Sequence, residues 1–79
     1  MTTAEIEESV IKIVSSELSI DSSEINGKTN ISGNTDSLVM KFEEVFDIVI
    51  PGNEQDFETV SDAVVCIDNI MNGQSIAGN

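Results

Sequence analysis

Three segments of this 79-residue chain place apolar side chains at the spacing of an amphipathic helix, and this pattern limits the possible folds more than any other feature. The first segment is residues 3–18, where Thr2 and Glu5 are placed to form a capping box. Its apolar positions are Ile6, Val10, Ile13, Val14 and Leu18. Charged side chains occupy the positions between them, so a helix with one buried face is predicted here.

Two more helices are predicted toward the carboxyl end of the chain. The second covers residues 35–47, with Asn34 or Asp36 as its cap. The third covers residues 59–71, because Thr-x-x-Asp at its start offers a capping box. Their apolar stripes are Leu38, Val39, Phe42, Val45 and Phe46 in the second helix, and Val60, Ala63, Val64, Ile67, Ile70 and Met71 in the third.

The segments between these helices have the composition of loops. Residues 19–34 are rich in Ser, Asn, Gly and Thr, and three isoleucines are expected to hold this long loop against the core. Residues 48–51 look strand-like but have no partner strand, so they are predicted to be an extended connector that ends at Pro51. Residues 53–58 could form one helical turn. The three loop isoleucines are Ile20, Ile25 and Ile31.

The fold class that follows is all-α. We expect a small antiparallel four-helix bundle, made of three main helices and one short helix, with a long first loop. Residues 1–79 form a single domain in this prediction, and residues 1–2 and 73–79 are expected to fray. The protein is expected to be a monomer.

The charge of the chain restricts its partners. Fifteen acidic residues and three basic ones give a net charge of −12, which repels phosphate backbones and anionic lipid surfaces. We therefore expect no binding to nucleic acid and no membrane insertion, and a partner with a basic patch is favoured. No segment is apolar enough to be a signal sequence or to span a bilayer, so a cytoplasmic location is expected.

The sequence also argues against catalysis and metal binding. There is no His, so the usual base for a Ser or Cys nucleophile is missing, and Cys66, which has apolar neighbours, is expected to be a buried thiol. Residues 26–29 resemble the end of a phosphate-binding loop, but Ser22 stands where the first glycine belongs. Residues 21–32 lack the Gly and Glu that a calcium-binding loop requires. An enzyme is not expected.

One short motif has both a structural and a functional interpretation. Asp36-Ser37-Leu38 stands at the predicted start of the second helix, where Asp and Ser are ordinary residues. A hydroxyl on the first turn of a helix, at the positive end of its dipole, is also a favourable place to hold a phosphodiester.

With this motif included, the chain resembles an acyl carrier protein over about residues 3–72. Asp36-Ser37-Leu38 matches the attachment motif of that family, residues 39–51 (VMKFEEVFDIVIP) are similar to its second helix and following connector, and residues 57–70 (FETVSDAVVCIDNI) resemble its third and fourth helices. The resemblance implies a four-helix bundle whose serine carries 4′-phosphopantetheine. The thiol of that arm holds an acyl group as a thioester, while basic partner enzymes dock on the second helix.

By matching position, the resemblance assigns a role to individual residues. Ser37 is the attachment site. A phosphopantetheinyl transferase (holo-acyl-carrier-protein synthase) and later acyl-transfer or synthase enzymes would contact six residues. These are Asp36, Leu38, Met40, Glu43, Glu44 and Ile50.

The chain departs from the family pattern directly after this motif. Leu38 continues at once into Val39-Met40, which leaves the segment about five residues short, and five residues rotate a helix by about 500°. If residues 39–46 are aligned instead, Ser32 takes the attachment position, so Ser32 is the rival of Ser37. The leading hypothesis is a carrier of acyl intermediates for fatty acid, polyketide or related lipid synthesis. The alternative is an acidic interaction module with the same bundle and no prosthetic group.

Overall fold

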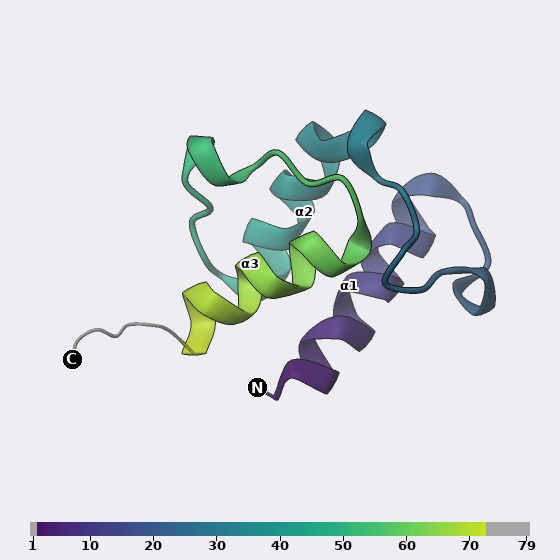
Figure 1. Ribbon diagram of the computed structural model, residues 1–79, viewed down its shortest axis with the longest axis horizontal. Coiled ribbons are helices and arrows are strands. Elements are labelled where there is room, and N and C mark those ends of the chain that lie inside the picture. Colours follow the sequence, from purple (N-terminus) through teal and green to yellow (C-terminus); the bar gives the residue numbers. More distant parts are fainter. Residues whose placement is uncertain (1, 73–79) are drawn as a thin grey trace.

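The computed structural model describes residues 2–72 and is helical, as predicted (Figure 1). Its three α-helices are α1 (Thr3–Leu18), α2 (Thr35–Phe46) and α3 (Val60–Asn72). Three short 3-10 turns lie between them, and these are η1 (Ser22–Glu24), η2 (Ser32–Asn34) and η3 (Gly52–Glu54). The predicted fold class, a small helical bundle with a long first loop, is confirmed.

The first helix is the centre of the bundle, because it packs against both α2 and α3. In Figure 1, α2 runs back toward the end of the molecule where α1 begins, and α3 ends on that same side. The long first loop is tied to the start of α3 by an isolated β-bridge between Asn30 and Thr59. This bridge brings the segments that precede α2 and α3 next to each other.

The core consists of apolar side chains from the helices and from the loops. Phe42 and Phe57 meet in it, with ring centroids 6.1 Å apart. No polar side chain within residues 2–72 is buried. The buried residues are Ile6, Val10 and Val14 from α1, Leu38, Val39, Phe42 and Phe46 from α2, Val60, Ala63, Val64 and Ile67 from α3, and Ile25, Ile31, Ile50 and Phe57 from the connections.

Most predicted core positions are confirmed, with one correction on α2. Val45 is 57% exposed, although it was assigned to the apolar stripe of that helix. Val45 lies at the edge of the apolar stripe, about 80° around the helix from the direction midway between Phe42 and Phe46. Its side chain lines the space between α1 and α2. Ile20 in the first loop is half-buried, whereas Ile25 and Ile31 are buried.

The helix starts follow the predicted caps in two cases out of three. Thr2 Oγ1 accepts the N–H of Glu5 at 3.1 Å, and Glu5 Oε1 accepts the N–H of Thr2 at 2.8 Å. Thr59 and Asp62 form the corresponding pair before α3. The cap predicted for α2 is wrong, because no side chain caps that helix and Asn34 (φ −129°, ψ 21°) lacks the extended backbone of an N-cap residue.

The connection from α2 to α3 is extended at first, as predicted, and its short helix is shifted. A 3-10 turn at Gly52–Glu54 replaces the turn predicted over residues 53–58. The Gln55 side chain holds the turn by donating to the carbonyl oxygen of Ile50 at 2.8 Å. Of the ends expected to fray, residues 1 and 73–79 lie outside the described residues, while Thr2 belongs to the capping box of α1. No helix of the described chain is long and apolar enough to cross a bilayer.

Candidate functional site

The amino end of α2 is held in place by the long first loop. The backbone N–H of Ile31 donates to the carbonyl oxygen of Glu58 at 2.8 Å, and that of Val60 donates to Thr29 at 3.0 Å. The Ile31 side chain is fully buried directly after this pairing. The chain then turns into η2 and continues without a break into α2, so residues 32–46 form one helical stretch whose first turns lie at the surface.

Ser37 is the third residue of α2 and is exposed. Within residues 2–72 its hydroxyl has no hydrogen-bond partner, and the next side chain, Leu38, is fully buried in the core. A buried leucine therefore fixes the backbone while the neighbouring serine presents an unengaged hydroxyl to solvent. The partial positive charge of the helix amino terminus favours an anion at this position.

Ser32 is also exposed, but its polar groups are already used. Its hydroxyl donates to Asn30 Oδ1 at 2.9 Å, and its backbone N–H donates to the same oxygen at 3.1 Å. It is the first residue of the helical stretch 32–46. The two serines thus differ: Ser32 opens the helical stretch and its hydroxyl is hydrogen-bonded, whereas Ser37 lies inside the first turn of α2 and its hydroxyl has no hydrogen-bond partner within residues 2–72.

The six residues assigned to partner contacts do not share one surface. Met40 is 72% exposed, and Asp36 and Glu44 are also exposed. Leu38 and Ile50 are 0% and 2% exposed, because both belong to the apolar stripe that forms the core. Their side chains are therefore not available to a partner in this conformation.

Glu43 has a local role that the sequence did not indicate. It is half-buried, and its Oε2 accepts the backbone N–H of Ile50 at 2.8 Å, which ties the end of α2 to the extended connector.

Val49, in the same connector, is 79% exposed and was not assigned to the surface. The alternation of side chains along an extended segment could have identified it, because Ile50 faces inward and its neighbour must face outward.

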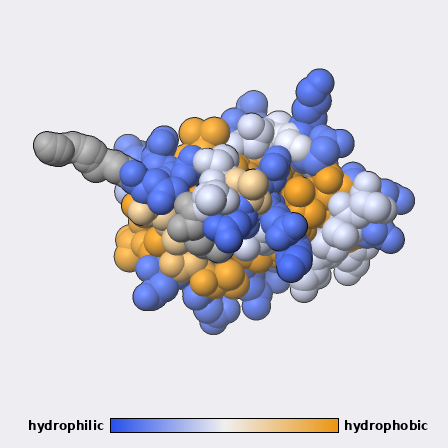
Figure 2. Space-filling view, turned by 90° about the horizontal axis from the view of Figure 1, so that it is seen from below, coloured by the Kyte–Doolittle hydropathy of each residue, from blue (hydrophilic) through white to orange (hydrophobic). Residues whose placement is uncertain are grey.

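Apolar and acidic groups are mixed over the surface. Figure 2 shows one face on which apolar patches are separated by hydrophilic side chains. The exposed large apolar residues are Met40, Val45, Val49 and Val65. Positive charge is rare: on α2 the Lys41 ammonium lies 3.9 Å from Glu44, and both side chains are more than half exposed. A pair this exposed contributes little to stability.

Cys66 is the only sulfhydryl and is half-buried rather than fully buried as expected. Burial, followed by the nearby Glu54 carboxylate 3.7 Å from Sγ, raises the pKa of the Cys66 thiol to about 11. The thiol is therefore protonated at neutral pH, and its nucleophilicity is low. Nowhere in residues 2–72 do three or more His, Cys, Asp or Glu side chains gather so that they could hold a metal ion.

Comparison with known proteins finds a relative that covers most of the chain. No protein-family model matches the chain. Over 76 residues, the chain is 38% identical to the acyl carrier protein of Prochlorococcus marinus (strain MIT 9515), and the match covers 86% of this chain and 95% of that protein. Since 86% of a 79-residue chain is fewer than 76 residues, the relative has residues in the matched region with no counterpart here.

Proposed function

The chain belongs to the acyl carrier protein family, and we propose that it carries acyl intermediates on a 4′-phosphopantetheine arm attached to Ser37. Members of this family are carriers and not enzymes. The function therefore depends on how the chain presents a tethered group. No catalytic site in the chain is needed for this function.

The observation that carries this proposal is the exposure of the Ser37 hydroxyl, which has no hydrogen-bond partner within residues 2–72. Its hydroxyl is exposed and unengaged, lies inside the Asp-Ser-Leu motif, and is backed by the fully buried Leu38. A phosphodiester on this oxygen would lie at the amino end of α2, where the helix dipole favours negative charge. When bound, the arm supplies a terminal thiol to which an acyl group is joined as a thioester. The residues present therefore fit the group.

The surface around Ser37 supports docking of basic partners. Asp36 and Glu44 expose carboxylates and Met40 exposes an apolar side chain on the same helix. We propose that a phosphopantetheinyl transferase and acyl-transfer or synthase enzymes with basic surfaces approach this face of α2, attracted by the net charge of −12. Such attraction weakens as salt is added. The proposed setting is fatty acid, polyketide or related lipid synthesis in the cytoplasm, with the carrier as a monomer.

A specific observation also favours Ser32 as the attachment residue. It is the first residue of the helical stretch 32–46, which is where alignment of residues 39–46 with the family places the modified serine. The shortened segment supports a further alternative, an acidic interaction module that keeps the bundle and carries no arm.

Mass spectrometry after incubation with coenzyme A and a phosphopantetheinyl transferase tests these alternatives. We expect the wild-type chain to gain the mass of one arm, Ser37→Ala to gain nothing, and the control Ser32→Ala to gain the same mass as the wild type. Loss of the gain in Ser32→Ala and its survival in Ser37→Ala would assign the site to Ser32. No gain with several transferases would reject the carrier function and favour the interaction module.

A further inference from the structure

The first loop contains a tight turn at Asn26-Gly27 that is fixed by three hydrogen bonds. The backbone N–H of Thr29 donates to the carbonyl oxygen of Asn26 at 3.1 Å, and the backbone N–H of Asn26 donates to Thr29 Oγ1 at 2.9 Å. The N–H of Lys28 donates to Asn26 Oδ1 at 2.8 Å, which closes an Asx-turn. The oxygen of the Asn26 side-chain amide is therefore held against the backbone that follows it.

Two groups of this turn are left free by these bonds. Within residues 2–72, the Nδ2 group of Asn26 donates to no acceptor, and neither does the backbone N–H of Gly27. Asn26 is exposed, so water reaches its side chain. The backbone nitrogen of Gly27 is thus unengaged beside a side-chain amide carbon whose oxygen already accepts a hydrogen bond.

This arrangement favours attack of the backbone nitrogen on the side-chain amide. When the Gly27 nitrogen bonds to Asn26 Cγ, negative charge develops on Oδ1, where the N–H of Lys28 stabilises it. Glycine has no Cβ to obstruct the approach. The turn itself does not require glycine, because the φ of Gly27 is not positive and an added Cβ would meet only Ser61 Cβ, at 3.7 Å.

We propose that Asn26-Gly27 is a site of spontaneous covalent modification, at which the asparagine loses ammonia and becomes aspartate or isoaspartate. The Gly27 nitrogen bonds to Cγ, the Cγ–Nδ2 bond breaks, and the proton of the Gly27 nitrogen passes through solvent to Nδ2, which leaves as ammonia. Water then opens the cyclic imide. Breaking the bond from nitrogen to Cγ gives aspartate, and breaking the bond from nitrogen to the backbone carbon gives isoaspartate. The inference does not rest on the proposed attachment at Ser37.

The two products differ in their effect on the fold. The backbone N–H of Ser61 donates to the carbonyl oxygen of Gly27 at 2.9 Å, which ties this turn to the start of α3. Aspartate leaves the backbone unchanged. Isoaspartate adds one methylene to the backbone and removes from it the Asn26 carbonyl group that accepts the N–H of Thr29. We therefore expect isoaspartate, and not aspartate, to displace Gly27 from Ser61.

Peptide mapping by mass spectrometry, after incubation of the full chain at mildly alkaline pH, tests the site. The peptide that contains Asn26 should gain the mass difference between an amide and a carboxylic acid. The rate should rise with pH, because the attacking nitrogen must lose its proton. Gly27→Ala should slow the gain roughly tenfold, because its Cβ hinders the approach while the fold accommodates it.

A second variant and a matched control complete this test. Asn26→Ser keeps a short acceptor side chain for the turn and should abolish the gain. Asn34 is also exposed but precedes Thr35, so Asn34→Ser should leave the rate at Asn26 unchanged. A gain at Asn26 no faster than at Asn34, or an unchanged rate in Gly27→Ala, would overturn the proposal.

A second asparagine also precedes a glycine, so the two peptides must be mapped separately. Asn72 is the last residue of α3, and its Nδ2 donates to Asp68 Oδ1 at 2.5 Å. Modification confined to the Asn72 peptide would contradict the assignment to Asn26.

Hydrogen exchange measured by NMR tests the difference between the products. The aspartate and isoaspartate forms are separated by chromatography, and methylation by a protein isoaspartyl methyltransferase identifies the isoaspartate form. The Ser61 amide should lose protection in the isoaspartate form and keep it in the aspartate form. Asn26→Asp is the control for the added charge and should also keep it. Equal protection in both forms would refute the expected displacement of Gly27.

Discussion

The segments that precede α2 and α3 are paired at Asn30 and Thr59, yet the two helices begin in different ways. Before α3, Asp62 Oδ2 accepts the backbone N–H groups of Glu58 and Thr59 at 3.1 and 3.2 Å. Thr59 Oγ1 accepts the N–H of Asp62 in return. The start of α2 has no side-chain cap at all.

This difference separates a helix end closed by a carboxylate of the protein from one that has no side-chain cap. Asp62 places a carboxylate of the protein itself at the start of α3, so the orphan N–H groups and the dipole of that helix are already satisfied. At the start of α2 no side chain does this, because η2 precedes that helix without a break, and Asn30 Oδ1 accepts the N–H of Ser32 where the helical stretch 32–46 begins.

The largest expected effect concerns the core below the start of α2. Leu38→Ala should lower the free energy of unfolding by about 2–5 kcal/mol, because Leu38 is fully buried and its truncation leaves a cavity. Urea unfolding measures this loss. Met40→Ala is the control on the same helix, since Met40 is 72% exposed, and it should change stability by less than about 0.5 kcal/mol. Similar losses in the two variants would mean that Leu38 does not anchor this end.

A cap substitution at each helix tests the comparison directly. Asp62→Ala removes the acceptor of two backbone N–H groups and should cost about 1 kcal/mol of unfolding free energy. Asn34→Ala, before α2, should cost much less, because the Asn34 side chain makes no capping bond. Chemical denaturation of both variants at neutral pH measures the two losses of unfolding free energy. Equal losses would show that the two ends are capped to the same extent.

The smallest effect is a pH dependence at the capped start of α1. The pKa of Glu5 is lowered from 4.5, mainly because its carboxylate accepts the backbone N–H of Thr2. A lowered pKa in the folded state means that the stabilisation is present above 4.5 and is lost as the pH falls through the folded value. The difference in stability between the wild type and Glu5→Gln should therefore shrink on going from neutral pH to well below 4.5. A difference that stays constant would contradict the capping role of this carboxylate.

The helices themselves could be predicted closely from the sequence. Periodic apolar residues and the capping boxes at Thr2 and Thr59 placed α1 and α3 to within one residue. The prediction of the α2 cap failed, because it rested only on the presence of short polar side chains at Asn34 and Asp36. Asn34 has the composition of a cap, but its backbone N–H donates to Ile31 inside η2 at 3.0 Å, and this 3-10 turn removes the geometry that a cap requires.

The candidate site could be predicted only in part. The Asp-Ser-Leu motif made Ser37 the candidate attachment residue, and the charge of −12 favoured basic partners; both stay predictions. Which residues of α2 can meet a partner depended on what packs against that helix, so the burial of Leu38 was not apparent from a motif alone. The use of Glu43 to hold the Ile50 backbone N–H was equally hidden, because it joins positions seven residues apart across a turn.

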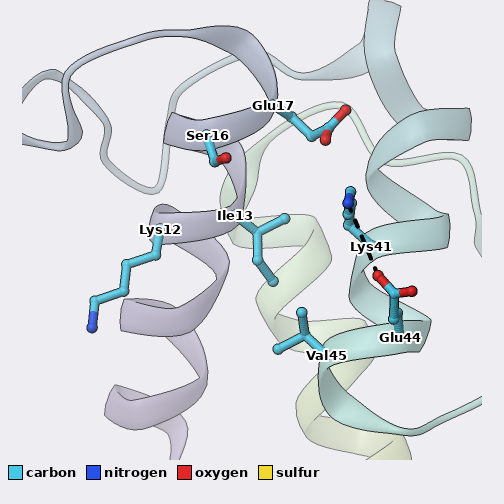
Figure 3. Close-up of a pocket in the computed structure, with 7 residues that line it drawn as sticks. All are labelled: Lys12, Ile13, Ser16, Glu17, Lys41, Glu44 and Val45. Atoms are coloured by element: carbon cyan, nitrogen blue, oxygen red, sulfur yellow. Dashed lines mark ion pairs between the residues drawn. The ribbon is translucent and has the colours of Figure 1, made fainter.

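By itself, the sequence determined the helical segments, the acidic character of the surface and the serine that stands in the family motif. These properties follow from local spacing and from charge, which do not depend on distant residues. Only the tertiary structure decided that α1 and α2 leave a groove between Ile13 and Val45 (Figure 3), and that the first loop pairs with the residues before α3. Both depend on contacts between residues far apart in the chain, and such contacts are decided when the core packs.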